Sequence, residues 1–125
     1  YFGHKASLHA GLTVMEMIEY WKAYYNSDAI TSDLIKFWDL PNKTVESCSE
    51  GQRKRIALVR LSLMKRNIWL LDEPTTNLDI VGKSKFSDLH TSHLRTGGLS
   101  IITTHEVLQF KGHKIINLDE HSGLI

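Results

Sequence analysis

The sequence predicts an α/β fold in which parallel strands are flanked by helices. Residues 68–71 are four consecutive apolar side chains without polar alternation, a pattern typical of a strand buried on both faces. A second apolar run, residues 99–104, follows a helical pattern and ends at His105. The first strand ends at Asp72 and Glu73, and Pro74 prevents its continuation.

Length and composition limit the function classes. A chain of 125 residues with 42% hydrophobic residues forms at most one domain with a real core. Its net charge of +1 gives no reason to expect nucleic-acid binding or attraction to an anionic membrane. The single cysteine, Cys48, excludes an internal disulfide and fits a reducing compartment. No apolar run is long enough for a transmembrane helix, and no signal-peptide pattern opens the chain.

Two helices are expected in the first third of the chain. Thr13 and Glu16 have the spacing of a capping box, so the first helix should begin there and run to about residue 25. Its apolar stripe is Val14, Ile18, Trp21 and Tyr25. Trp21 is expected to pack inward, whereas Tyr20 and Tyr24 fit packing and a protein-binding surface equally well. A second helix is expected over residues 28–40.

The pattern of residues 49–66 is the clearest helical pattern in the chain. Ser49 and Gln52 have the spacing of another capping box. Gly51 has no side chain to cover the first turn of the helix. Free N–H groups and the positive end of the helix dipole favour an anion there, although an ordinary helix start is the alternative. The basic residues of this segment are expected to face solvent or a partner: Arg53, Lys54, Arg55, Arg60, Lys65 and Arg66.

A helix should begin at Asp79 and end at Gly97-Gly98, with a last short strand at residues 114–118. His90 and His93 have a spacing that could ligate a metal ion. No carboxylate or cysteine lies at a matching distance along the chain, so we expect ordinary packing instead.

The acidic pair at the end of the first strand is the strongest candidate for chemistry. In open α/β sheets, ligands bind outside the carboxyl ends of the strands. Asp72 and Glu73 on such a rigid support could hold a metal ion and polarise a water molecule. The alternative is a solvated acidic turn.

The motifs around this pair occur in a known order. The segments at residues 49–52, 71–74 and 77–79, together with His105, resemble the signature loop, Walker B end, D-loop and switch histidine of the ABC-transporter ATPase family. The resemblance implies a partial P-loop NTPase fold of the ABC ATPase type. Residues 1–48 would hold the Q-loop region and a helical subdomain. Residues 49–125 would hold the remaining motifs of the catalytic core.

The resemblance also implies roles for individual residues toward ATP and Mg²⁺. Asp72 would hold magnesium through water, Glu73 would polarise the attacking water, and His105 would steady the γ-phosphate. Residues Ser49, Glu50, Gly51 and Gln52 would close over ATP held by a second ATP-binding subunit. Asp79 would communicate between the two subunits.

The sequence departs from the family pattern at several positions. Lys5 stands where the family has the Q-loop glutamine, and an ammonium group could contact phosphate but cannot ligate magnesium. Cys48 and Glu50 replace a leucine and a glycine of the signature loop. The phosphate-binding segment G-x-x-x-x-G-K-[ST] is absent from these residues. We therefore expect that the sequence begins mid-protein, and that these residues alone neither bind ATP tightly nor hydrolyse it.

The resemblance implies membrane partners. The compact insert between Lys5 and Ser49 favours a transporter subunit, and Gly3-His4 with Leu12-Thr13 resemble haem-exporter ATP-binding subunits of cytochrome c maturation. Such a subunit pairs with a second copy and with transmembrane subunits, and binds no nucleic acid. It would lie peripherally on the cytoplasmic face of the inner membrane, or on the matrix side in mitochondria. The alternatives are an ABC ATPase for another exported substrate and a non-catalytic interaction module.

Overall fold

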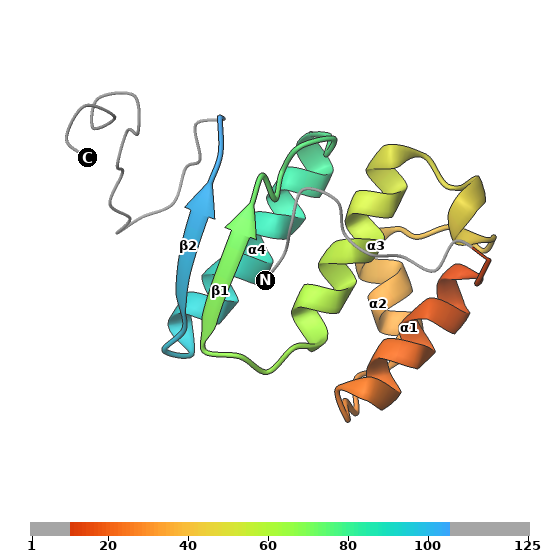
Figure 1. Ribbon diagram of the computed structural model, residues 1–125, viewed down its shortest axis with the longest axis horizontal. Coiled ribbons are helices and arrows are strands. Elements are labelled where there is room, and N and C mark those ends of the chain that lie inside the picture. The colour runs from red at the N-terminus through yellow and green to blue at the C-terminus, as the bar shows by residue number, and fades with distance from the viewer. Residues whose placement is uncertain (1–10, 106–125) are drawn as a thin grey trace.

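The computed structural model describes residues 11–105. Lys5 and the strand expected at residues 114–118 lie outside the described residues. Figure 1 shows a helical part on one side and a small parallel sheet on the other. In chain order the elements are α1 (Val14–Tyr24), α2 (Thr31–Trp38), the 3-10 helix η1 (Val45–Ser47), α3 (Glu50–Leu63), β1 (Ile68–Asp72), α4 (Ile80–Arg95) and β2 (Leu99–Thr103).

Both predicted capping boxes are present. The Thr13 hydroxyl accepts from the Glu16 amide at 3.1 Å, and the Glu16 carboxylate accepts from the Thr13 amide at 3.0 Å. Ser49 and Gln52 form the same reciprocal pair, at 3.1 and 2.9 Å. These local hydrogen bonds satisfy amides that lack an intrahelical acceptor, so they fix where α1 and α3 begin. α2 begins three residues later than expected, at Thr31.

The two strands form the parallel pair that the sequence predicts. Ile68 pairs with Leu99 and Asp72 with Thr103, while α4 makes the crossover between the strands. Because β1 and β2 run in the same direction, their carboxyl ends lie at the same edge of the fold. α3 and α4 run the opposite way, so their N-termini lie at that edge too (Figure 1).

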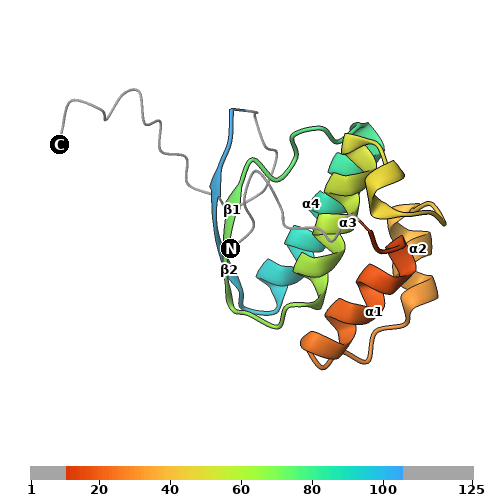
Figure 2. The ribbon, with the colours of Figure 1, turned by 45° about the vertical axis from the view of Figure 1, so that its right-hand side comes forward.

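The expectation that the first strand is buried on both faces is wrong for the described residues. Burial alternates along β1: Trp69 is 4% exposed, whereas Ile68 is 60% exposed. The described helices all lie on the Trp69 side of the sheet, as Figure 2 shows with the sheet nearly edge-on. No described element covers the other face, which carries the exposed aliphatic side chains Ile68, Leu70, Leu99 and Ile101.

α3 is the centre of the core. Ile56, Leu58 and Val59 point in different directions around the helix, yet each is completely buried, because α1 and α2 pack on one side and α4 on another. Trp21 is buried at 4% exposure, as predicted, whereas Tyr24 is 71% exposed. None of the helices in residues 11–105 has the length and apolarity needed to span a membrane.

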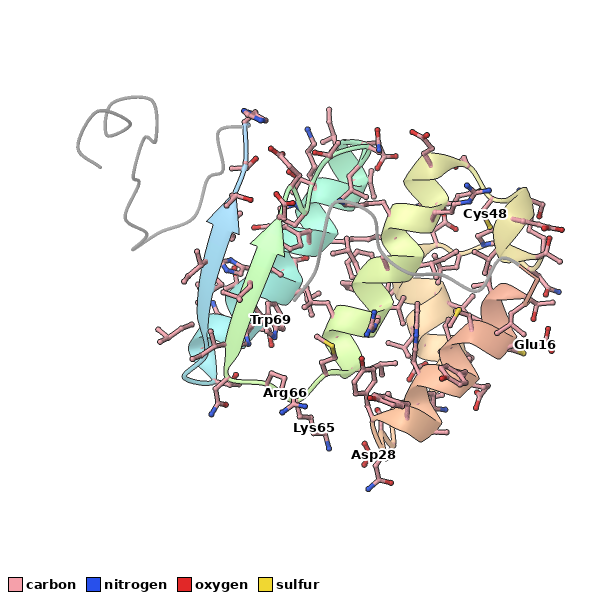
Figure 3. All side chains as sticks on the ribbon, in the orientation of Figure 1. Glu16, Asp28, Cys48, Lys65, Arg66 and Trp69 are labelled. Atoms are coloured by element: carbon pink, nitrogen blue, oxygen red, sulfur yellow. The ribbon has the colours of Figure 1, made fainter. Side chains whose placement is uncertain are left out.

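Lys54 is buried, and Arg55 and Arg60 are half-buried, so the expectation of a solvated or partner-facing side is wrong for these three residues. Arg53 donates to the carbonyls of Val45 and Glu46, and Arg55 donates to those of Trp38 and Asp39. The carbonyls of Trp38 and Asp39 lie at the C-terminal end of α2, where carbonyls lack intrahelical donors. Arg53 is exposed, as expected. The expectation also holds for Lys65 and Arg66, which project from the loop before β1 (Figure 3).

Candidate active site

The candidate site lies at the edge where both strands end. The Glu73 amide continues the strand pairing by donating to the Thr103 carbonyl at 2.8 Å. The Thr103 hydroxyl donates to Asp72 Oδ1 at 2.6 Å. Register therefore places the end of β2 beside both carboxylates, and His105 follows two residues after Thr103.

The Glu73 carboxylate is held by two neighbours. The His105 amide donates to Oε1 at 3.1 Å, and the Thr76 hydroxyl donates to Oε2 at 3.2 Å. The His105 imidazole Nε2 lies 3.5 Å from the same Oε1. The Glu73 side chain is only 15% exposed, whereas that of His105 is 99% exposed. The Glu73 carboxylate is therefore fixed and largely buried, and it lies next to the solvent-exposed imidazole of His105.

Glu73 has an unusual backbone conformation. Its φ is +49°, in the left-handed region that few residues other than glycine adopt. Pro74 follows, and a residue before proline normally favours extended conformations. Strain of this kind costs on the order of 1–3 kcal/mol and persists only where the surroundings enforce it. Hydrogen bonds to both the amide and the carbonyl of Glu73 supply such enforcement here.

Lys54 makes the hydrogen bond to the Glu73 carbonyl. Its side chain extends from α3, and Nζ donates to that oxygen at 2.6 Å. Lys54 is only 9% exposed, and a buried ammonium group is costly unless it is well hydrogen-bonded. The lysine therefore ties α3 to the turn that carries Glu73.

The start of α3 lies against the same turn. A Cβ built on Gly51 would lie 3.0 Å from the Asn77 carbonyl oxygen, so the backbones approach closely there. Asn77 has a φ of +67°. Asp79 then caps α4 by accepting from the Gly82 amide at 2.8 Å.

Several predicted site residues therefore come together. Asp72, Glu73 and His105 meet at the sheet edge, and Gly51 reaches the neighbouring turn. Ser49 and Glu50 are exposed at the helix start. Ser49 and Gln52 use their side chains on each other in the capping box, and Asp79 uses one carboxylate oxygen in its own cap.

The donor set suits a hydrated magnesium ion. Mg²⁺ prefers oxygen ligands and keeps several waters, so one or two carboxylates are sufficient when phosphate oxygens complete the shell. Asp72 is partly exposed and lies beside the Thr103 hydroxyl, so it offers oxygen chemistry of this kind. Within residues 11–105, no three His, Cys, Asp or Glu side chains gather into a self-sufficient metal site.

Three contributors to the site were not identified from the sequence: Thr76, Thr103 and Lys54. Thr103 could have been found by aligning the two strands in parallel, because the register sets it opposite Asp72. Thr76 and Lys54 gave no such signal, since nothing in a single sequence separates them from ordinary turn and helix-surface residues.

The His90 and His93 pair packs between α4 and β2, away from this edge. His90 Nε2 is hydrogen-bonded to the Ser100 hydroxyl, and His93 Nε2 lies 2.9 Å from the Leu99 carbonyl. The His93 ring stacks on Trp69 at 3.6 Å with an interplanar angle of 4°. Burial, followed by the neighbouring His93, lowers the pKa of His90 to about 4. These contacts therefore support ordinary packing as the role of His90 and His93.

A comparison with family models matches residues 1–76 to the family described as "ABC transporter". Among curated proteins, the chain is 35% identical over 114 residues to the cytochrome c biogenesis ATP-binding export protein CcmA of Nitrobacter winogradskyi. It is also 35% identical over 120 residues to the protein of that name from Paracoccus denitrificans. These alignments cover 86% and 94% of the chain but only 56% and 57% of the relatives.

Solved structures share the fold. An ATP-binding subunit of an ABC transporter superposes with a TM-score of 0.70 at 16% identity, over 82% of the chain and 46% of that subunit. The ATP-binding cassette MJ0796, in a dimeric post-hydrolysis state with ADP and Pi, superposes with a TM-score of 0.64 at 24% identity. That alignment covers 80% of this chain and 49% of the cassette. The predicted fold class is therefore confirmed.

Proposed function

The chain belongs to the ABC transporter family, and from this premise we propose that it acts in an ATP-hydrolysing subunit that drives haem export for cytochrome c biogenesis. The names of the curated relatives support the export role. The observation that carries the chemistry is the Glu73 carboxylate, fixed at the carboxyl edge of the sheet and in contact with His105. The chain spans 56% of the first of these relatives, so the proposal concerns the subunit as a whole.

Glu73 is the proposed base that orients and polarises the attacking water. Thr76 and the His105 amide hold both carboxylate oxygens, so little reorganisation is needed when charge develops. The exposed His105 imidazole is proposed to donate to a γ-phosphate oxygen. Bound Mg²⁺ would neutralise phosphate charge, with Asp72 as its proposed protein ligand through water. Phosphoryl transfer depends mainly on such positioning and charge stabilisation.

The start of α3 is proposed to act on a nucleotide held by a second subunit. Ser49 and Gly51 lie on its exposed first turn, where amides without intrahelical acceptors and the helix dipole favour phosphate. Glu50 places a negative charge in this turn, which weakens the attraction. Asp79, which caps α4 beside the same turn, is the proposed link between subunits. The dimer of the structurally similar MJ0796 cassette supports this arrangement.

The helical part is proposed to contact the transmembrane subunits at the cytoplasmic face of the membrane. α1 exposes Tyr20 and Tyr24, at 52% and 71%, and tyrosine side chains often anchor protein interfaces. Residues 1–48 are proposed to hold the Q-loop region and a helical subdomain. Residues 49–125 are proposed to hold the remaining motifs of the catalytic core. Lys5, which we propose contacts phosphate rather than magnesium, lies outside the described residues.

The test is Glu73→Gln in a full-length subunit that carries this chain. Glutamine keeps the shape and the hydrogen-bond acceptor but cannot take a proton, so ATP turnover should fall by about 100-fold or more while ATP still binds. A closed, ATP-bound dimer should accumulate and be visible by size-exclusion chromatography. Asp88→Asn on the exposed surface of α4 is the matched control and should turn over ATP normally.

Unchanged turnover in Glu73→Gln would remove Glu73 from the role of base. Absence of ATP binding by the full-length wild-type subunit would favour the non-catalytic interaction module instead. Haem-dependent stimulation of the ATPase, measured with the transmembrane subunits present, separates haem export from export of another substrate.

A further inference from the structure

Lys54 is buried, charged and not yet assigned a role in the proposed chemistry. We propose that Lys54 is a positioning residue that holds the Glu73 peptide in its left-handed conformation and so aims the carboxylate at the sheet edge. This inference rests on the proposed function and deepens it. It links two parts of the proposed site through α3. The start of α3 would contact the nucleotide of a partner subunit, and the Glu73 carboxylate would act on the chain's own nucleotide.

The first step is that one face of α3 supports the whole turn between β1 and α4. Gly51 and Lys54 are three residues apart, so they lie on the same side of the helix. Gly51 approaches the Asn77 carbonyl, and Lys54 Nζ donates to the Glu73 carbonyl at 2.6 Å. α3 therefore approaches this turn closely at Asn77 and is hydrogen-bonded to it at Glu73.

The second step concerns the peptide that Lys54 holds. A residue before proline at positive φ tends to relax toward an extended conformation. The Glu73 amide is fixed by β2 through Thr103, so rotation of the peptide would have to move its carbonyl. The Thr76 amide also donates to this carbonyl, but at 3.3 Å, so the short hydrogen bond from the ammonium is the stronger restraint.

The third step is the consequence for the carboxylate. Its hydrogen bonds to the His105 amide and the Thr76 hydroxyl are made while the backbone of Glu73 is left-handed. If the peptide relaxed, the carboxylate would leave its position near His105. Lys54 thus acts on chemistry without touching substrate, and a movement of α3 would be transmitted to Glu73.

The experiment compares Lys54→Met with Lys54→Arg and Arg60→Met. Methionine keeps the length and removes the donor, while arginine restores a donor. Arg60 lies on the same helix and donates to the Tyr25 hydroxyl at 2.9 Å, away from Glu73. Arg60→Met is the control because it removes one positive charge and one hydrogen-bond donor from α3, as Lys54→Met does, but outside the site. In the 125-residue chain, the amide NMR signals of Glu73 and His105 should shift in Lys54→Met and remain in place in Arg60→Met.

In the full-length subunit, Lys54→Met should lower kcat about tenfold while KM for ATP changes less than about twofold, because positioning of the carboxylate affects the transition state rather than binding. Lys54→Arg should recover much of kcat. If Lys54→Met does not fold, Lys54→Leu, which also lacks a donor, takes its place in both comparisons.

The outcomes separate the two proposals. Amide shifts at Glu73 no larger in Lys54→Met than in Arg60→Met, or an unchanged kcat, would overturn the positioning role. If the full-length wild type has no ATP turnover, the proposed function fails, and the amide signals alone still decide whether Lys54 positions Glu73.

Discussion

Substitution of Gly98 by alanine should destabilise the protein through a single contact. A Cβ at this position would lie 2.6 Å from His93 Nδ1 and nearer still to two other ring atoms. The imidazole has little room to move away, because Trp69 is stacked on it at 3.6 Å and its Nε2 lies 2.9 Å from the Leu99 carbonyl. Gly98 is not among the described residues with positive φ, so the backbone itself accepts alanine.

The expected loss of stability is estimated from three contributions that the clash can affect. Overpacking costs about 1–3 kcal/mol, the hydrogen bond to Leu99 about 1 kcal/mol, and the ring stack about 0.5–1.5 kcal/mol. Because His93 can relieve the clash by giving up only some of these, we expect Gly98→Ala to lower the free energy of unfolding by about 2–4 kcal/mol. The corresponding fall in Tm is roughly 10 °C.

Urea unfolding of a double-mutant cycle measures the effect. In a His93→Ala background the clash partner is missing, so Gly98→Ala should cost less than about 1 kcal/mol there. Gly97→Ala is the neighbouring control: its φ of +88° brings backbone strain, but nothing lies within 4 Å of the added methyl group. An equal cost of Gly98→Ala in both backgrounds would refute the contact argument.

Two further predictions concern titration and the approach of α3 to the turn. Lowering the pH from 6.5 toward 4 should reduce the free energy of unfolding by up to about 3 kcal/mol through His90, because the unfolded chain binds a proton that the buried imidazole resists. Urea titrations of wild type and His90→Gln check this, since the variant should lose that part of the pH dependence. Gly51→Ala should change stability by less than about 1 kcal/mol, because better helix propensity offsets the 3.0 Å approach to Asn77. The displaced turn should nevertheless shift the Asn77 amide signal in NMR spectra, and an unmoved signal would contradict the close approach.

Features encoded by local chemistry could be predicted from the sequence. Thr13 with Glu16, and Ser49 with Gln52, satisfy each other's backbone groups within one helical turn, so spacing alone identifies them. The parallel pairing of β1 and β2 followed from two apolar runs separated by a helix, and it places His105 beside Glu73. The family model and the related structures confirm the fold that these features indicated.

Features that depend on distant partners could not be predicted. The basic residues of α3 read as a solvated surface, but Lys54 and Arg55 each satisfy a backbone carbonyl that only folding brings within reach. The positive φ of Glu73 runs against the preference of a residue before proline, so local propensity predicts the opposite conformation. The burial of β1 was overestimated because an apolar run shows that a strand can be buried on both faces. It does not show whether another element packs on each face.

The open side of the sheet has a practical consequence for handling the protein. Ile68, Leu70, Leu99 and Ile101 form two cross-strand pairs on a water-facing surface. Kosmotropic salts and moderate warming strengthen attraction between such surfaces, so molecules of the purified chain should adhere to one another in sulfate-rich buffers well before they unfold. Light scattering against ammonium sulfate concentration would detect this adhesion. Leu70→Lys, which places a charge at the centre of the patch, should move its onset to higher salt.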